Sequence, residues 1–149
     1  MSYETLDRIA DSYIPLLVVC CLILVVMPFQ RGLTAAGLVG ARFVLLVALV
    51  ATVYIWMFAD ARWAIWPALG RLDYSTHTAL ALALVMFLWV WVARLRWLWI
   101  GSFIAYVLLM RYQAYHTFLD MVTTGLVMGA CGSGILYIYR RLQGRVDHS

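Results

Sequence analysis

The sequence predicts an all-α integral membrane protein, a bundle of about five transmembrane helices with its active site at one membrane face. Hydrophobic residues make up 66% of the 149 residues and charged residues only 12%. A soluble domain of this length cannot bury so much apolar surface. The apolar residues also fall in long runs separated by short charged segments, as in successive membrane-spanning helices. A single domain over residues 1–149 is expected.

The predicted segments follow one another as an interfacial stretch, five apolar runs and a tail. Residues 1–12 are polar with scattered apolar side chains and predict a short amphipathic helix at the membrane surface. They lack the basic start of a signal peptide, so the first run is expected to remain as an anchor. Residues 13–139 form the predicted bundle, and residues 140–149 its tail. The apolar runs are residues 14–29, 35–58, 76–92, 97–110 and 116–139.

The arginines predict the orientation in the membrane, because basic residues are more frequent in cytoplasmic loops. With the N-terminus outside, six arginines lie near the inner helix ends and four near the outer ends. The inner set is Arg31, Arg94, Arg96, Arg140, Arg141 and Arg145, and the outer set is Arg8, Arg62, Arg71 and Arg111. The difference predicts a plasma or inner membrane protein with an extracytoplasmic N-terminus and a cytoplasmic C-terminus.

Small residues on the last run predict close helix packing. Gly125 and Gly129 have the spacing of a helix-packing motif, and Gly132 and Gly134 follow them. We expect this face to pack against other helices of the same chain. The alternative is that it packs between chains, in a homodimer or a membrane complex. Arg42, inside the second run, is expected to extend its side chain to the interface.

Two histidines are predicted at the same membrane face. His77 begins the third run and His116 begins the fifth. Asp120 follows His116 by four residues, which on a helix places both side chains on one face. A carboxylate there can fix the imidazole tautomer and leave the other ring nitrogen to react. The alternative is that these residues only cap and anchor a helix. Asp73 or Ser75 is expected to cap the third helix.

This set of residues suits phosphoryl transfer. One imidazole can attack phosphorus and form a phosphohistidine, and the second can act as general acid and base. Arginines on the same face, Arg62, Arg71 and Arg111, can bind phosphate oxygens. No metal or cofactor is required. The adjacent Cys20 and Cys21, and Cys131, lie in apolar runs and predict neither a disulfide framework nor a zinc site.

The two histidine segments resemble motifs of the type 2 phosphatidic acid phosphatase family. The sequence Ser75-Thr76-His77-Thr78 resembles the family's Ser-Gly-His motif. The segment Arg111-(x)4-His116-(x)3-Asp120 resembles its third motif, Ser-Arg-(x)5-His-(x)3-Asp. The stretches Asp-Tyr-x-x-His-Thr and His-Thr-x-x-Asp are also similar to the sphingomyelin synthase-like branch. The resemblance covers roughly residues 59–135.

The resemblance implies a role for each matching residue. His116 would be the nucleophile, Asp120 its orienting carboxylate and His77 the acid and base. Arg111 would bind phosphate, together with Ser75 and the backbone near Thr76. The family's first motif, Lys-(x)6-Arg-Pro, is not matched; Arg62 and Arg71 are the nearest substitutes. The family's usual core has six helices, one more than the chain predicts.

The expected function is therefore a membrane phosphatase or phosphotransferase that acts on a lipid phosphate at the extracytoplasmic face. The lipid could be a polyprenyl phosphate or pyrophosphate, a polyprenyl-linked sugar phosphate or a glycerolipid phosphate. Membrane lipids are its expected surroundings, and the composition gives no reason to expect nucleic acid. Two alternatives stay open. One is a metal or haem protein that uses His77 and His116 as ligands. The other is a non-catalytic relative that serves as a partner subunit or lipid-binding module.

Overall fold

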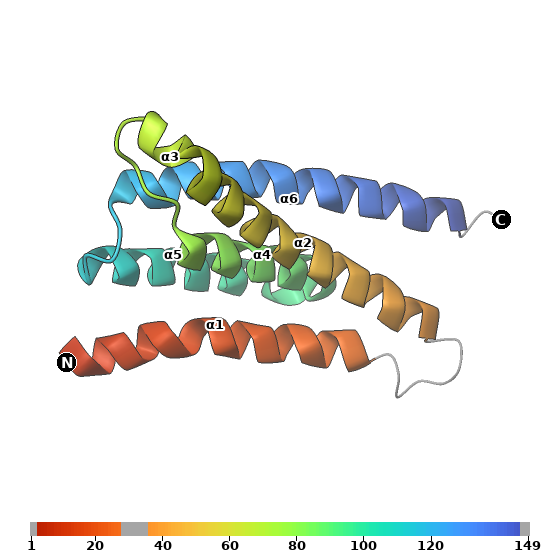
Figure 1. The fold of residues 1–149 in the computed structure, drawn as a ribbon. Coiled ribbons are helices and arrows are strands. Elements are labelled where there is room, and N and C mark those ends of the chain that lie inside the picture. Colours follow the sequence, from red (N-terminus) through yellow and green to blue (C-terminus); the bar gives the residue numbers. More distant parts are fainter. Residues whose placement is uncertain (1–2, 28–35, 147–149) are drawn as a thin grey trace.

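The computed structural model describes residues 3–27 and 36–146, and within them the chain is almost entirely helical (Figure 1). The elements are α1 (Tyr3–Val26), α2 (Ala36–Trp63), α3 (Ile65–Ala68), α4 (Thr76–Trp91), the 3-10 turn η3 (Ala93–Leu95), α5 (Arg96–Tyr112) and α6 (Phe118–Val146). The helices α1, α5 and α6 run nearly parallel, and α2 crosses them at an angle.

Four of these helices are long and apolar enough to cross a membrane, which identifies the chain as an integral membrane protein. The candidate spans are Glu4–Val26, Gly37–Trp63, Ala93–Tyr112 and Phe118–Gln143. Each has at least 20 residues, the length that a hydrocarbon core of about 30 Å requires. The third predicted run forms α4, which has only 16 residues. It is apolar but about 24 Å long at the usual helical rise.

The short helix α4 is the centre of the bundle. It packs against α1, α2, α5 and α6, and small side chains at Ala79, Ala81 and Ala83 are fully buried in it. Small residues let neighbouring helix backbones approach closely. Phe87 and Leu88 fill the space farther along the helix. The first turn of α4, which carries His77, is thus held in a fixed position by four surrounding helices.

Two predicted boundaries differ from the structure because helices continue through polar residues. The interfacial segment predicted over residues 1–12 is the beginning of α1, with residues 1 and 2 outside the described part. Its buried side chains, Ala10, Leu17, Cys21 and Val25, form one stripe that continues past residue 12. The helix α6 likewise extends from the predicted end at Tyr139 to Val146. Gln143 Nε2 donates to Tyr139 Oη at 3.0 Å, across one helical turn.

The glycines of α6 differ in how closely they are packed. A Cβ at Gly132 would lie 2.6 Å from Met86 Sδ, whereas one at Gly125, Gly129 or Gly134 would meet nothing within 4 Å. The close contact within the chain therefore uses Gly132, which lies one turn beyond the Gly125–Gly129 pair.

Arg42 connects three helices at the end of the bundle away from the N-terminus. Its Nη1 donates to the carbonyl oxygen of Leu24, and its guanidinium lies 4.1 Å from the centroid of the Trp91 ring. The side chain therefore joins α2 to α1 and α4, where the sequence predicts only an extension toward the interface.

Candidate active site

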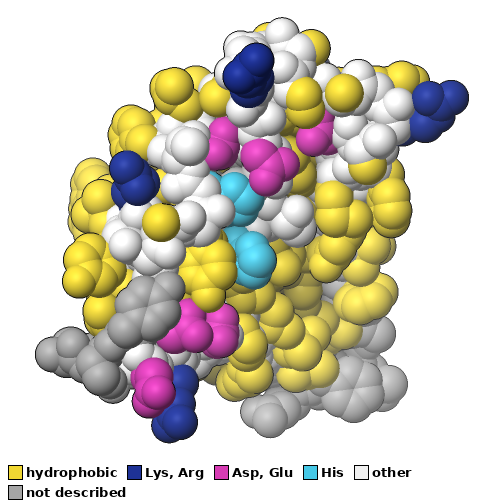
Figure 2. All heavy atoms as spheres, turned by 60° about the vertical axis from the view of Figure 1, so that its left-hand side comes forward, with side chains coloured by type: hydrophobic (Ala, Val, Ile, Leu, Met, Phe, Trp, Pro, Cys, Tyr) yellow, Lys and Arg dark blue, Asp and Glu magenta, His cyan; other side chains and the backbone are white. Residues whose placement is uncertain are grey.

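Both predicted histidines lie at the end of the bundle that carries the N-terminus, α3 and the turn between α5 and α6 (Figure 1). His77 is the second residue of α4, and His116 lies two residues before α6 begins. Figure 2 shows the two histidine side chains next to each other on this face, with acidic side chains on both sides and arginines farther out. The predicted juxtaposition of His77 and His116 is thus present in the structure.

The beginning of α6 is fixed by a reciprocal pair of hydrogen bonds. Asp120 N donates to Thr117 Oγ1 at 3.2 Å, and Thr117 N donates to Asp120 Oδ2 at 2.8 Å. This is the arrangement of a capping box, in which two otherwise unpaired N–H groups of a helix start are satisfied. Asp120 is 4% exposed, so this cap is inside the protein. The helix therefore begins after His116, not at it.

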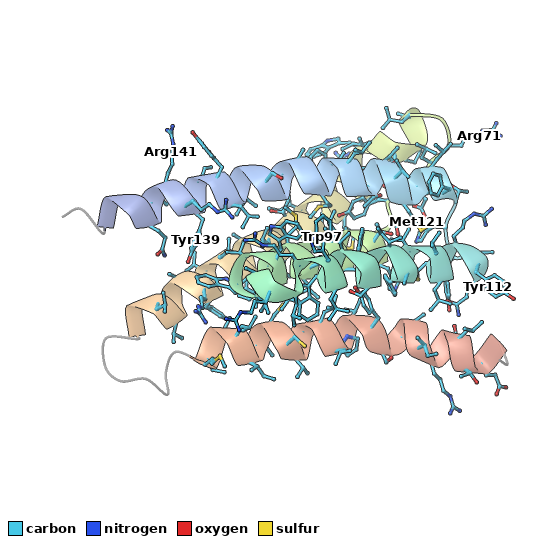
Figure 3. All side chains as sticks on the ribbon, turned by 180° about the vertical axis from the view of Figure 1, so that it is seen from behind. Arg71, Trp97, Tyr112, Met121, Tyr139 and Arg141 are labelled. Atoms are coloured by element: carbon cyan, nitrogen blue, oxygen red, sulfur yellow. The ribbon has the colours of Figure 1, made fainter. Side chains whose placement is uncertain are left out.

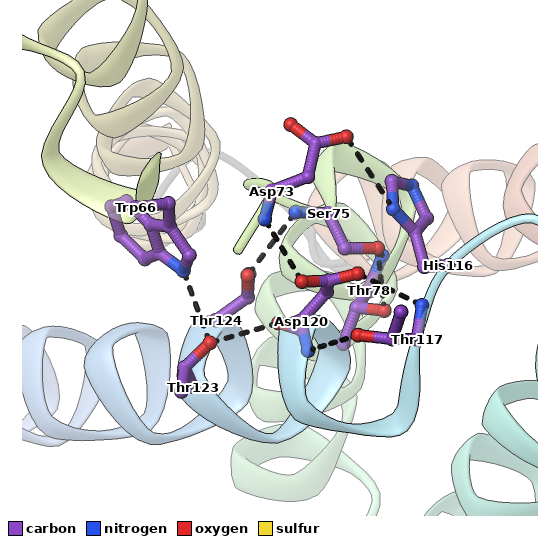
Figure 4. Close-up of polar contacts among 9 residues, drawn as sticks. All are labelled: Trp66, Asp73, Ser75, Thr78, His116, Thr117, Asp120, Thr123 and Thr124. Carbon is purple, nitrogen blue, oxygen red and sulfur yellow. Dashed lines mark hydrogen bonds and ion pairs between the residues drawn. The ribbon is translucent and has the colours of Figure 1, made fainter. Parts of the chain in front are cut away.

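The carboxylate of Asp120 also binds the loop before α4. Its Oδ1 accepts a hydrogen bond from Asp73 N at 2.8 Å (Figure 4). Each of its two oxygens thus receives one backbone N–H, one from each histidine-bearing segment. Such charge-assisted hydrogen bonds are stronger than neutral ones. Asp120 therefore connects the two segments that position the histidines.

The start of α4 is held by hydroxyl groups. Ser75 is the N-cap residue, and its Oγ accepts from Thr78 N at 3.4 Å and lies 2.9 Å from Thr78 Oγ1. Ser75 N donates to Thr124 Oγ1 of α6 at 3.1 Å. The predicted capping role of Ser75 is confirmed. Its side chain is completely buried, whereas the resemblance implies a phosphate-binding role for it.

Two buried aromatic residues anchor the loop between α3 and α4. Trp66 N donates to Asp60 Oδ1 at 2.7 Å, and Trp66 Nε1 donates to Thr123 Oγ1 at 3.1 Å. Tyr74 packs edge-on against the Trp66 ring and donates from its hydroxyl to the carbonyl oxygen of Val53 at 3.0 Å. Burial raises the pKa of Tyr74, so the phenol stays protonated as that donor. These contacts fix the course of the loop that carries Asp73.

The carboxylate that faces His116 is that of Asp73. His116 Nδ1 lies 3.7 Å from Asp73 Oδ2 (Figure 4). His116 is 15% exposed and Asp73 is 73% exposed, so the imidazole is largely enclosed while its acidic neighbour reaches it from the solvent side. The sequence assigned this place to Asp120 by helical spacing. That spacing does not apply, because His116 precedes the helix.

An apolar groove of about 300 Å³ opens beside His77, between α1, α4 and α5. Apolar side chains form most of its walls, and four polar residues lie among them. The apolar residues are Ala10, Ile14, Leu80, Tyr106 and Met110, and the polar ones are Asp11, Thr76, His77 and Tyr115. Its volume is at the lower end of the range of ligand pockets. Of the two histidines, it is His77 that lines the groove.

The three predicted phosphate-binding arginines lie at the rim of this face. Arg62 is in the last turn of α2, Arg71 in the loop before α4, and Arg111 in the last turn of α5. All three are exposed. Figure 3 shows Arg71 extending away from the bundle at this end and Arg141 at the opposite end. The three arginines are thus exposed at this end of the bundle, and none of them lines the groove beside His77.

Sequence reasoning missed the position of Asp73 relative to His116 and the role of α1. The sequence places Asp73 on the same face as the histidines and offers it as a helix cap, but it does not pair this carboxylate with His116. The contribution of α1 comes from Asp7, whose Oδ1 accepts hydrogen bonds from Tyr115 Oη at 2.8 Å and Gln113 Nε2 at 3.3 Å. These contacts join the N-terminal helix to the turn that carries His116.

Within residues 3–27 and 36–146, no group of three or more His, Cys, Asp or Glu side chains is arranged to hold a metal ion. No family model matches the sequence, and no match was found among curated proteins or solved structures.

Proposed function

We propose that this protein is a membrane phosphatase or phosphotransferase that acts on a lipid phosphate through a phosphohistidine at His116. One observation carries the proposal. Two histidines, one in the first turn of α4 and one in the turn before α6, lie side by side at one end of the bundle, and His77 lines an apolar groove. A nucleophile with an orienting carboxylate and a separate acid–base group is the arrangement that covalent phosphoryl transfer needs.

In the proposed reaction, His116 Nε2 attacks phosphorus and the bond from phosphorus to the lipid oxygen breaks. His77 donates a proton to that leaving oxygen. In the second step His77 removes a proton from water, or from an alcohol acceptor, whose oxygen attacks the phosphohistidine. The phosphoryl group leaves with this oxygen, and His116 is free again. Each histidine thus returns to its starting state after one cycle.

Backbone groups at the start of α4 would bind the phosphate together with the arginines. The first N–H groups of a helix have no acceptor within the helix and attract anions. Those of Thr76 and His77 lie in this turn, directly beside the proposed acid–base group. Arg62, Arg71 and Arg111 have long side chains and would reach the phosphate oxygens from the rim. Ser75, which is buried, is left out of the proposed phosphate site.

The proposed placement in the membrane has the site and N-terminus on the extracytoplasmic side and the C-terminus in the cytoplasm. The arginine distribution supports this orientation. We propose that α4 is the fifth membrane-embedded helix, enclosed by the four longer ones. The groove beside His77 would then hold the apolar chain of a lipid whose phosphate lies at the membrane surface.

A bulky side chain in the groove is expected to weaken lipid binding. Ile14 lines the groove, and Ile14→Trp should raise KM for the lipid phosphate about tenfold and change kcat less than about twofold. A rise in KM alone indicates lost binding that is equal in the ground and transition states. Val19→Trp is the matched control, since Val19 lies on the same helix and is exposed. Equal KM values for the two variants would place the lipid chain elsewhere.

The proposed activity can be tested with purified protein in detergent and a chelator. Phosphate release would be measured with polyprenyl phosphate, polyprenyl pyrophosphate and diacylglycerol phosphate, with and without an alcohol acceptor. Release from at least one lipid is expected. Release that occurs only when a divalent cation is restored would favour a metal enzyme. A folded protein that releases nothing under any of these conditions would favour the non-catalytic alternative.

A further inference from the structure

We propose that Asp73 is the positioning residue that orients the His116 imidazole, and that Asp120 acts by holding Asp73 in place. This inference rests on the proposed function in one respect, that His116 is the reacting group. It assigns different tasks to the two carboxylates near that histidine, and it makes the loop before α4 part of the site.

The contacts of Asp120 are made to the backbone. Its Oδ1 accepts from Asp73 N and its Oδ2 accepts from Thr117 N, both at 2.8 Å. These two donors come from different segments and fix the plane of the carboxylate between them. The side chain is buried, so turning it toward the imidazole would break a charge-assisted hydrogen bond to a partly buried N–H group, which is costly. Asp120 therefore holds the loop before α4 and the start of α6 together.

The contacts of Asp73 have the opposite character. Its backbone N is held by Asp120, while its side chain is mostly exposed and its Oδ2 lies 3.7 Å from His116 Nδ1. A hydrogen bond from an imidazole N–H needs about 3 Å between the heavy atoms. A rotation of the exposed carboxylate can close this gap, and such bonds in active sites often shorten when substrate binds.

A carboxylate at Nδ1 determines which nitrogen reacts. The neutral ring carries one proton, and a carboxylate acceptor keeps that proton on the nitrogen that faces it. With Asp73 at Nδ1, the lone pair of His116 stays on Nε2. Within the described residues, the side chain that forms an ion pair with the His116 ring is that of Asp73. Asp120 also interacts electrostatically with His116, but both of its carboxylate oxygens accept backbone N–H groups.

The tautomer of His116 provides a test that does not depend on activity. The chain has only three histidines. The ring nitrogens can therefore be assigned by NMR of ¹⁵N-histidine-labelled protein in detergent, using His148→Gln as background and His77→Gln for assignment. At about pH 9, where an ordinary imidazole is neutral, the parent should carry its proton on Nδ1. Asp73→Ala should shift the proton predominantly to Nε2. Asp73→Asn, which keeps an acceptor oxygen, should preserve the parent tautomer.

Kinetics provide the second readout. Asp73→Ala should lower kcat about 10- to 100-fold and change KM less than about twofold, as expected for a group that acts through another residue. Glu4→Ala, which removes an acidic side chain at the same end of the bundle, is the control and should change neither tautomer nor kcat. A His116 tautomer that is unaltered in Asp73→Ala would overturn the assignment.

The two proposals fail in different ways. If the parent protein releases no phosphate but its His116 tautomer depends on Asp73, the orientation stands and the proposed function fails. If the parent is active and the tautomer is lost in Asp120→Ala but not in Asp73→Ala, the function stands and Asp120 is the orienting residue.

Discussion

Replacement of His116 with glutamine is expected to lower phosphate release by at least about 10⁴-fold. Removal of a covalent nucleophile costs more than removal of any other group in such a site. Glutamine keeps the approximate size and polarity of the side chain but cannot form a stable phosphoryl adduct. Because His116 lies in a turn outside α6, the substitution should leave the helix and the stability of the fold nearly unchanged.

His77→Gln is the companion variant and should lower kcat by about 10²- to 10⁴-fold, the usual effect of a general acid–base group. His148→Gln is the matched control, because that histidine is not part of the proposed site. The comparison is made with one lipid phosphate in the presence of a chelator. Phosphate release that persists at the parent rate in His116→Gln would contradict the phosphohistidine assignment.

Asp120→Ala is expected to destabilise the protein by roughly 3 kcal/mol. The substitution leaves two partly buried N–H groups, those of Asp73 and Thr117, without their acceptors. An unpaired buried donor costs about 1–3 kcal/mol, and the lost bonds were made to a charged group. It also separates α6 from the loop before α4, which should disturb both histidine segments. The midpoint of unfolding in a denaturant titration of the detergent-solubilised protein measures the effect.

Asp73→Ala is the control for this stability measurement. Its side chain is exposed, and the backbone N–H that Asp120 binds remains in the variant. Surface substitutions of this kind usually change the unfolding free energy by less than about 0.5 kcal/mol. If Asp120→Ala unfolds at the same midpoint as Asp73→Ala, then Asp120 does not connect the two segments in the way the hydrogen bonds indicate.

The sequence predicted the class of fold and the meeting of two histidines because both follow from long-range patterns. Apolar runs give the helices, and alternating crossings place every second loop on the same side. The two histidine segments, around His77 and His116, therefore had to meet if each lies at the same end of its helix. In the structure, both segments lie at the same end of the bundle.

The contacts within the site were not predictable, because they depend on where single turns begin. The spacing of His116 and Asp120 predicts neighbours on one helix face, but α6 starts at Phe118. The i, i+4 rule therefore does not hold for His116, which is not helical. Asp73 lies in an irregular loop whose course is set by the buried contacts of Trp66 and Tyr74. No local pattern in the sequence encodes those contacts.

The sequence also predicts two helix boundaries at polar residues through which the helices continue. Charged residues do not end α1, whose buried stripe starts at Ala10, before the predicted first run. The arginines Arg62, Arg71 and Arg111 were grouped with the histidines because they fall on the same side. Sharing a side does not bring side chains into contact, and these three lie at the rim.

The most direct test of the central proposal is to trap the phosphorylated protein. Purified protein would be incubated with a lipid phosphate that carries ³²P in its transferred phosphate, quenched within milliseconds to seconds, and examined for label on the polypeptide. We predict an acid-labile label on the parent, a stronger one on His77→Gln if its second step slows more than its first, and none on His116→Gln. Label that persists on His116→Gln, or a parent that releases phosphate without ever becoming labelled, would contradict the account.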